Sequence, residues 1–429
     1  MDASIRVEET SALTSLEAYR QHDAAGGLAP SALSGLRVAL VHDWLTGMRG
    51  GEKCLEVLCQ AFPQAVLYTL IHRRGSTSPA IESMIIHTSP LQKVPGVFRH
   101  YRQLLPVMPL AASTWKPKNV DLVISLSHCV AKSVQAPRGV PHLCYCFTPM
   151  RYAWQGRDAY LEGWSKRPIR RALARTLLDR LRDWDRKTAH RVSQFVAISQ
   201  TIRERIALCY HRDSVVIPPP VDTDFFTPLS RDQTREDFYL VVSALVPYKR
   251  IDQAVAACTH LDRRLIVIGA GPERARLEAL AGPTVQFLGW QPDEVIRDHY
   301  RRCRALLFPG EEDFGIVPVE ALACGAPVIA LGRGGAAETV DRSVGCLYDQ
   351  PTTTALETAI ASWEAQGHPH DPLLARARAE EYGLAVFRGR ILSLIGQVTD
   401  RSVETAAVPP RPHLALHQQD SQRLDVLDR

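Results

Sequence analysis

Two glutamates at a fixed separation are the residues best suited to chemistry in this sequence. Glu312 and Glu320 are separated by seven residues in the segment 308–325, which reads FPGEEDFGIVPVEALACG. Pro318 suits the first position of a helix and Gly325 its end, so we expect a short helix with Glu320 in its first turn and Glu312 on the loop before it. Carboxylates accept hydrogen bonds from hydroxyl groups, so the pair suits a polyhydroxylated ligand. Two solvated surface carboxylates are the simpler alternative.

Free backbone donors are expected beside these carboxylates. The first N–H groups of a helix have no partner within the helix, and here they belong to Phe314, Gly315 and Ile316. They can meet anionic or hydroxyl oxygens of the same ligand. A Glu-x7-Glu spacing alone arises often by chance, but Glu-x-Phe-Gly followed by Glu-Ala-Leu-Ala at a strand–loop–helix junction is much more specific.

The glycine turn at Gly50 and Gly51 is a second candidate site. It follows an apolar run over 36–41, which predicts a buried strand, and precedes apolar residues at helical spacing over 52–58. A strand, a glycine turn and a helix direct free N–H groups at an anion, and paired glycines permit close approach. We expect this turn to face phosphate or substrate. A tight turn that binds no ligand would have the same sequence pattern, and this alternative stays open. The spacing is not the G-x-G-x-x-G of dinucleotide sites.

His128 is a third candidate because it follows the predicted strand 120–126. Ligands of parallel sheets bind outside the carboxyl ends of the strands, which is where His128 would lie. His42 and the segment 148–152, Thr-Pro-Met-Arg-Tyr, occupy equivalent positions after other strands. A single histidine in a loop is usually solvated, and this alternative stays open.

The elements that must position these residues alternate between apolar runs and helical stretches in both halves of the chain. This alternation predicts an α/β protein with parallel sheets and right-handed crossovers. We expect strands at 36–41, 65–70, 120–126, 142–147 and 194–198, and then at 239–244, 265–268, 285–288, 305–308, 328–331 and 346–348.

Length predicts two folded units, because 429 residues exceed one compact core. Three prolines, Pro218–Pro220, mark a stiff boundary at which the units would close on each other. The expected organisation is a disordered extension 1–34, a first Rossmann-like domain 35–222, a linker 223–237, a second Rossmann-like domain 238–385, a helix 386–400 returning toward the first domain, and a disordered tail 401–429.

Composition excludes several classes of protein. A hydrophobic content of 45% and a charged content of 23% exclude a mainly disordered or collagen-like chain. A net charge of +5 does not suggest a general nucleic-acid binder. No apolar run approaches the ~18 residues of a membrane helix, and the N-terminus lacks a secretory signal. The ten cysteines include no C-x-x-C pair, so we expect reduced thiols in a cytoplasmic protein, peripheral at most on the inner membrane face.

The segment 164–191 is more basic than the chain as a whole. It carries ten Lys or Arg against three Asp, and Leu173, Leu177, Leu181 and Trp184 fall on one helical stripe. An amphipathic helix packed on its own domain is the favoured interpretation. Contact with anionic lipid head groups or a diphosphate-linked acceptor is the alternative. Nucleic acid is not expected, because no nucleic-acid-binding motif accompanies the charge.

These motifs resemble family 4 of the retaining glycosyltransferases, which share the two-domain GT-B fold with parallel sheets facing across a cleft. The resemblance covers roughly residues 36–398 by order of motifs. Beside the two glutamates it rests on Ala197-Ile198-Ser199, on the segments 217–222, 246–250 and 269–273, and on Gly334-Gly335.

The resemblance implies that 35–222 is the acceptor-side domain and that 238–385 is the nucleotide-sugar-binding domain. It also implies a role for each candidate residue. Glu320 would bind the donor's ribose, and Glu312 with the N–H groups of 314–316 would hold the donor sugar. Lys249 would bind the diphosphate, with Arg250 beside it, and His128 would lie near the reacting carbon. The Gly50-Gly51 turn would help to stabilise the departing diphosphate. No metal and no cofactor are expected.

Two departures from the family pattern affect this reading. The family usually has Gly-Arg where this chain has Ser243-Ala244, so Arg250 or a first-domain residue would have to supply the missing charge. Phe147 stands where the similar bacterial subgroup, which builds surface polysaccharides, usually has His. That subgroup includes many mannosyltransferases that use GDP-mannose.

The sequence therefore predicts transfer of a hexose from a GDP- or UDP-linked donor to a glycan or polyprenyl-diphosphate-linked acceptor. A catalytically impaired nucleotide-binding or scaffold protein on the same fold remains an alternative, as does a nucleotide-sugar epimerase or phosphorylase.

Overall fold

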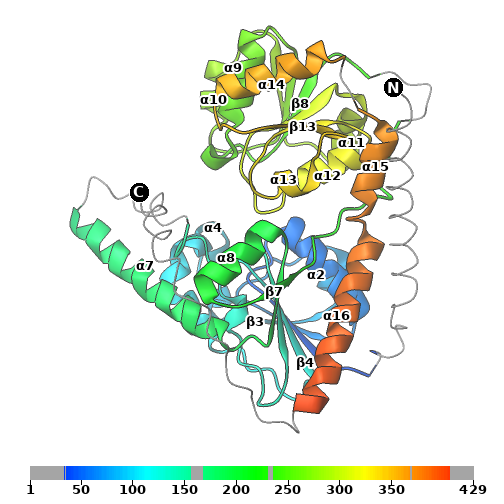
Figure 1. Ribbon diagram of the computed structural model, residues 1–429. Coiled ribbons are helices and arrows are strands. Elements are labelled where there is room, and N and C mark those ends of the chain that lie inside the picture. Colours follow the sequence, from blue (N-terminus) through cyan, green and yellow to red (C-terminus); the bar gives the residue numbers. More distant parts are fainter. Residues whose placement is uncertain (1–32, 34, 156–167, 230–234, 368–369, 406–429) are drawn as a thin grey trace, which may run out of the picture.

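The computed structural model describes residues 33, 35–155, 168–229, 235–367 and 370–405, and it contains two parallel sheets with helices around them (Figure 1). The α/β prediction is confirmed. The predicted disordered segments are 1–34 and 401–429. Of these, 1–32, 34 and 406–429 lie outside the described part of the chain, whereas 401–405 are helical, so the prediction of disorder there was wrong.

The N-terminal sheet has seven strands in the order β3-β2-β1-β4-β5-β6-β7. Two of them were not predicted: β3, because its residues are mostly exposed, and β7, because it lies against the proline segment. The strands are β1 Val38–His42, β2 Val66–Thr69, β3 Ile85–Thr88, β4 Leu122–Ser127, β5 His142–Cys146, β6 Gln194–Ala197 and β7 Ser214–Val216.

Helices pack around this sheet and fill the connections between its strands. Two hydrophobic clusters bury the strands, which read as continuous apolar runs because both faces are covered. The α-helices are α2 Gly50–Ala61, α3 Pro79–Glu82, α4 Val97–His100, α5 Met108–Ala112, α7 Pro168–Ala189 and α8 Gln200–Tyr210, and the 3₁₀ helices are η2 Pro90–Lys93, η3 Tyr101–Val107 and η4 Ala131–Ser133.

The C-terminal sheet has six strands in the order β10-β9-β8-β11-β12-β13, all at predicted positions. They are β8 Tyr239–Val242, β9 Leu265–Ile268, β10 Val285–Gly289, β11 Ala305–Phe308, β12 Val328–Leu331 and β13 Gly345–Tyr348. The helices are η5 Pro247–Lys249, α9 Ile251–His260, α10 Arg274–Leu280, α11 Asp293–Arg302, α12 Ile316–Ala323, α13 Ala336–Thr339, α14 Thr353–Ala365 and α15 Pro372–Glu380.

Helix α12 begins earlier than predicted. Its first residue is Ile316, with Gly315 at the N-cap in a left-handed conformation, so Pro318 is the third residue rather than the first. The prediction of Pro318 as the first position was wrong, but proline is tolerated throughout the first turn, where no N–H is needed. The predicted end is confirmed, because the Gly325 N–H donates to the Leu322 carbonyl as the chain turns away.

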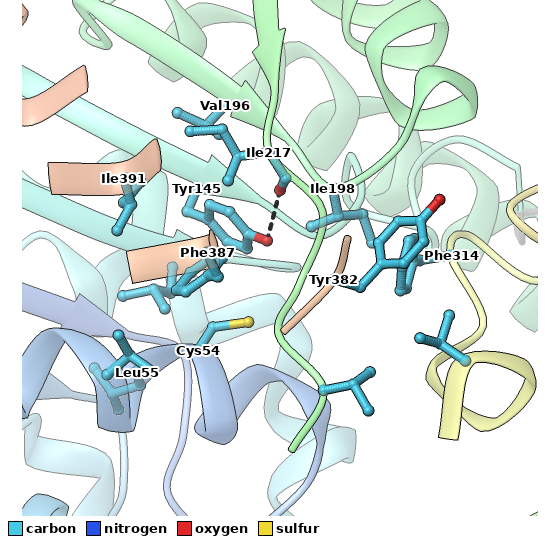
Figure 2. Close-up of a cluster of buried hydrophobic side chains, with 14 of the residues drawn as sticks. Cys54, Leu55, Tyr145, Val196, Ile198, Ile217, Phe314, Tyr382, Phe387 and Ile391 are labelled. Carbon is cyan, nitrogen blue, oxygen red and sulfur yellow. Dashed lines mark hydrogen bonds between the residues drawn. The ribbon is translucent and has the colours of Figure 1, made fainter. Parts of the chain in front are cut away.

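Two chain crossings join the domains. The Val221 N–H donates to the Tyr382 carbonyl at 2.8 Å, so the end of the proline segment lies beside the short connection between α15 and the helix that follows it. Helix α16, Leu384–Thr405, then packs along the N-terminal sheet, where Phe387 meets Tyr145 edge-on (Figures 1 and 2). It starts two residues before the predicted helix and continues five residues into the predicted tail.

Two further expectations concern the state of the cysteines and the presence of membrane-spanning helices. All ten cysteines are unpaired, and nine of them are buried. In the described ranges we find no helix whose length and apolar character would let it cross a membrane.

Candidate active site

The strand order reverses once in each of the two sheets. In the N-terminal sheet the order reverses between β1 and β4, and in the C-terminal sheet between β8 and β11. Ligands of doubly wound sheets bind at such switch points, outside the carboxyl ends of the strands. The first switch point carries His42 and His128, and the second carries Lys249 and Glu312.

Asp43, directly after β1, organises the first switch point. The fully buried carboxylate accepts four backbone N–H groups, from His128, Cys129, Val130 and Ala131, at 2.6–2.9 Å. These N–H groups precede and begin the short helix η4, whose free donors need an acceptor. Asp43 thus fixes the loop that follows β4.

The same carboxylate orients the His128 ring. His128 Nδ1 lies 3.1 Å from Asp43 Oδ2, while Trp44 packs edge-on against the ring at 4.4 Å between centroids. Desolvation lowers the pKa of His128, and attraction to Asp43 offsets it only in part. A carboxylate that faces Nδ1 favours the neutral tautomer protonated at Nδ1, which leaves Nε2 as an acceptor.

The glycine turn lies between the two domains. Gly50 is the first residue of α2, and a Cβ there would sit 2.4 Å from the Ile316 side chain of the C-terminal domain. A Cβ at Gly51 would sit 3.2 Å from the Phe147 ring. The glycines therefore permit close approach of protein to protein at this place.

His42 and Glu52 form a buried pair beneath this turn, with His42 Nε2 3.6 Å from Glu52 Oε1. Burial raises the pKa of Glu52, but its hydrogen bond and attraction to His42 outweigh this, and the pKa lies below its ordinary value. Glu52 also accepts the Arg49 backbone N–H at 3.1 Å and so ties the start of α2 to the site.

Lys249 and Glu312 form an ion pair at the second switch point, with both side chains mostly buried. Burial and the nearby Arg151 guanidinium lower the pKa of Lys249 to about 8, and attraction to Asp313 opposes them only in part. Arg250 is directed elsewhere: its backbone is left-handed, and its guanidinium lies 3.4 Å from Asp252.

Asp313 connects the domains. Its carboxylate pairs with Arg151 and Arg205 of the N-terminal domain, and its carbonyl accepts the Ser199 hydroxyl at 2.5 Å. Arg151 belongs to the Thr-Pro-Met-Arg-Tyr segment after β5 and also lies over the Tyr248 ring at 5.8 Å. A first-domain cation is therefore close to Lys249.

Glu320 is the fifth residue of α12 and is buried, so it lies in the second turn rather than in the first turn predicted from Pro318. Its carboxylate accepts the Tyr300 hydroxyl at 3.2 Å and lies 3.7 Å from Lys53 Nζ of the N-terminal domain. Burial raises the pKa of Glu320, and attraction to Lys53 opposes the shift. Lys53 thus occupies a carboxylate oxygen that a ligand hydroxyl could approach.

The loop that carries Glu312 packs tightly on its neighbours. The Gly335 N–H donates to the Glu312 carbonyl at 2.8 Å, and a Cβ at Gly335 would sit 2.2 Å from the Phe314 backbone. Among the described residues, the N–H groups of 314–316 make no hydrogen bond, as predicted for free donors.

The structure brings the predicted residues of each switch point together and adds several that the sequence did not single out. The added residues reach the site from distant parts of the chain and act through charge or packing: Asp43, Glu52, Lys53, Arg151 and Asp313. Within the described ranges, no group of three or more metal-ligating side chains is arranged to hold an ion.

Comparison with protein families matches almost all of the two domains. A model described as Glycosyltransferase Family 4 matches residues 48–225, and one described as Glycosyl transferases group 1 matches residues 224–383. The chain belongs to the family 4 glycosyltransferases and has the GT-B fold, as the motifs predicted.

Named relatives cover part of the chain. A GDP-mannose-dependent alpha-(1-6)-phosphatidylinositol monomannoside mannosyltransferase of Mycolicibacterium smegmatis is 31% identical over 46% of this chain and 57% of its own length. A D-inositol 3-phosphate glycosyltransferase of the same organism is 33% identical over 36% of this chain and 39% of its own. The matches thus span less than two thirds of these relatives.

Solved structures share the fold at low identity. Anabaena Alr3699/HepE in complex with UDP and glucose aligns with a TM-score of 0.60 and 19% identity, covering 84% of this chain and 99% of that one. The lipopolysaccharide outer core galactosyltransferase WaaB in its apo form aligns with a TM-score of 0.57 and 15% identity, covering 86% and 100%.

Proposed function

We propose that the chain is a retaining glycosyltransferase that transfers a hexose, with mannose from GDP-mannose the favoured donor, to a glycan or lipid-linked acceptor. The observation that carries the proposal is the meeting of two switch points. One offers Lys249, Glu312 and free N–H groups, and the other offers His128. Relatives named as GDP-mannose-dependent mannosyltransferases support the choice of donor.

In this proposal the nucleotide sugar lies on the C-terminal domain. Glu320 accepts hydrogen bonds from the ribose, and Glu312 with the N–H groups of 314–316 holds the sugar. Lys249 stabilises the departing diphosphate, and the start of α2 at Gly50 adds a helix N-terminus. The acceptor hydroxyl attacks from the face of the leaving group, and a diphosphate oxygen takes its proton.

Arg151 is the first-domain residue best placed to replace the charge missing at Ala244. It is near enough to Lys249 to lower that residue's pKa, and it already pairs with Asp313 beside Glu312. Arg250 is less suited, because it pairs with Asp252. The proposal therefore assigns the second cation at the diphosphate to Arg151.

The test is a thermal-shift panel of GDP, UDP and ADP with their sugars, followed by turnover of the donor that binds. A ligand of the native state raises Tm, and we expect GDP-mannose to give the largest shift and to be consumed. A shift without consumption would instead favour the catalytically impaired binding protein, for which Ala244 is the motivating observation.

Replacing Glu320 with alanine should weaken nucleotide binding about ten- to a hundredfold. Loss of a carboxylate that accepts hydrogen bonds typically costs ~1.5–3 kcal/mol. The measurement is titration of the free nucleoside diphosphate. Tyr300→Phe is the matched control, because it removes the internal partner of Glu320 but leaves the carboxylate. Unchanged affinity in Glu320→Ala would exclude the ribose role.

Helix α7 carries the proposed membrane contact. Its C-terminal half is anchored by buried Asp185, which accepts Lys132 Nζ at 2.6 Å and the Tyr210 hydroxyl at 2.7 Å. Leu181 is buried and Leu177 and Trp184 pack beside it, but Leu173 is 67% exposed, so its predicted place on the packed stripe was wrong. The helix extends away from the domain at its other end (Figure 1).

Vesicles rich in anionic lipid should therefore bind the chain, more weakly at physiological than at low salt, because exposed charges are screened over ~8–10 Å. Arg171 and Arg175, both exposed, are the residues to replace with glutamine, and binding should fall. Exposed Arg264 and Arg276 on the C-terminal domain serve as the control pair. Equal binding to neutral and anionic vesicles would leave α7 as a packing helix.

A further inference from the structure

A cavity of about 310 Å³ opens on the N-terminal domain beside the candidate active site. Four arginines, two aromatic rings and a threonine line it, and we call it the arginine pocket. The arginines come from three segments far apart in the sequence: Arg49 before α2, Arg73 after β2, and Arg99 and Arg102 in α4 and η3.

The charge of the arginine pocket is not balanced by the protein. Among the residues that the structure describes, none of these four guanidinium groups forms an ion pair with a carboxylate. Two are held by aromatic faces instead, Arg73 over Phe98 at 5.1 Å and Arg102 over Tyr101 at 5.6 Å. Stacking fixes the direction of a guanidinium while its N–H donors stay available.

Aromatic side chains connect the arginine pocket to His128 by direct packing. Tyr101, which lines it, lies 5.1 Å from Trp44 between ring centroids, and Trp44 packs against His128. A bridge between Leu45 and His72 pairs the loops after β1 and β2, from which Arg49 and Arg73 project. The pocket is therefore on the domain opposite Lys249 and Glu312.

We propose that the arginine pocket binds a phosphate or diphosphate group of the acceptor. Convergent guanidinium groups without a carboxylate partner match phosphoryl oxygens, which they contact in pairs. The volume lies near the lower end for small-ligand sites, which suits a charged group with part of an attached sugar. A ligand anchored there reaches His128 across Trp44, which leaves the donor side free.

The identification of this ligand as the acceptor rests on the proposed function, but the anion site itself does not. A purely solvated basic surface is the competing interpretation, because the arginines are exposed. Such a surface would bind anions weakly and with no preference for the residues that line the cavity. The experiment therefore compares arginines inside the cavity with exposed cations just outside it.

The probe is inorganic diphosphate, titrated into the full chain with its donor site saturated by whichever nucleoside diphosphate raises Tm. Arg73→Gln with Arg99→Gln should weaken diphosphate binding at least about tenfold. Arg74→Gln with Lys93→Gln removes the same charge from neighbouring exposed positions outside the cavity and should change it less than about twofold. Equal losses in the two double variants, or no binding by the unmodified chain, would overturn the proposal.

Two arms distinguish the source of the phosphoryl group. Zwitterionic vesicles that contain a polyprenyl diphosphate should retain the control variant but not the pocket variant if the acceptor is lipid-linked. A soluble sugar 1-phosphate that displaces diphosphate, without vesicle retention, indicates a soluble acceptor. Either result supports the arginine pocket, and loss of the difference between the variants in both arms contradicts it.

Nucleotide binding separates this proposal from the proposed function. Both double variants should keep the nucleotide affinity of the unmodified chain, because their residues lie on the other domain from Glu320. If diphosphate binds the arginine pocket while no nucleotide raises Tm, the anion site stands and the glycosyltransferase assignment fails. If nucleotide binds and the donor turns over while the two double variants behave alike, the assignment stands and the pocket proposal fails.

Discussion

Replacing Lys249 with alanine is expected to lower kcat/KM for the donor about 10²-fold or more, a rise in the barrier of ~3 kcal/mol. Lys249 is mostly buried, it lies against Glu312, and the arginine that usually accompanies it is absent at Ala244. A cation in such a water-poor place stabilises a departing diphosphate far more than a solvated one would. The measurement is donor turnover in the purified variant.

Rescue by a second substitution tests the same assignment. Ala244 is exposed, so Ala244→Arg has room for a long side chain and should restore part of the activity of Lys249→Ala. Arg250→Ala is the matched control and should have little effect, because Arg250 pairs with Asp252. A nearly silent Lys249→Ala beside a damaging Arg250→Ala would place the phosphate role on Arg250.

The acidity of Lys249 gives this prediction a pH dependence. Its pKa is lowered to about 8, so the free enzyme loses this charge as pH rises through about 8 rather than near the ordinary 10.5. kcat/KM should therefore fall from about pH 8 upward, and Lys249→Arg should remove that alkaline limb because arginine stays charged. An unchanged limb in Lys249→Arg would assign it to another group.

Local pattern was enough to predict the strands and the donor-side loop. Continuous apolar runs bounded by turns identify strands covered on both faces, and eleven of the strands lie where such runs occur. The order of motifs around Glu312 and Glu320 identifies a loop and helix that depend on neighbours close in sequence. Parallel pairing and right-handed connections were also predicted, but the order of the strands was not and comes from the structure.

Contacts between distant residues could not be predicted in this way. Arg151 and Asp313 are 162 positions apart and Asp43 lies 85 from His128, so no spacing joins them. The edge strand β3 was missed because its exposed residues lack a continuous apolar run. The start of α12 was misjudged because Gly315, in its left-handed conformation, supplies the N-cap three residues before Pro318.

Asp43 is one of the residues whose contacts the sequence could not predict, and its replacement is expected to have the second large effect. Its buried carboxylate accepts four backbone N–H groups and faces His128 Nδ1. Asp43→Ala would leave those donors unsatisfied in a dry place, so we expect the free energy of unfolding to fall by ~3–5 kcal/mol. Denaturant titration measures it, and Asp213→Asn, at an exposed carboxylate just before β7, should change the midpoint little.

A positioning role for Asp43 predicts more than lost stability. Asp43→Asn keeps one oxygen for two of the N–H groups but turns an amide NH₂ toward the others and no longer holds the Nδ1 proton of His128. The folded variant should therefore lose kcat with little change in KM, and nitrogen NMR should show a shifted tautomer of His128. Because neutral His128 depends on that carboxylate for the orientation of its ring, a variant that kept both kcat and the Nδ1–H tautomer would show that Asp43 supports only the backbone of η4.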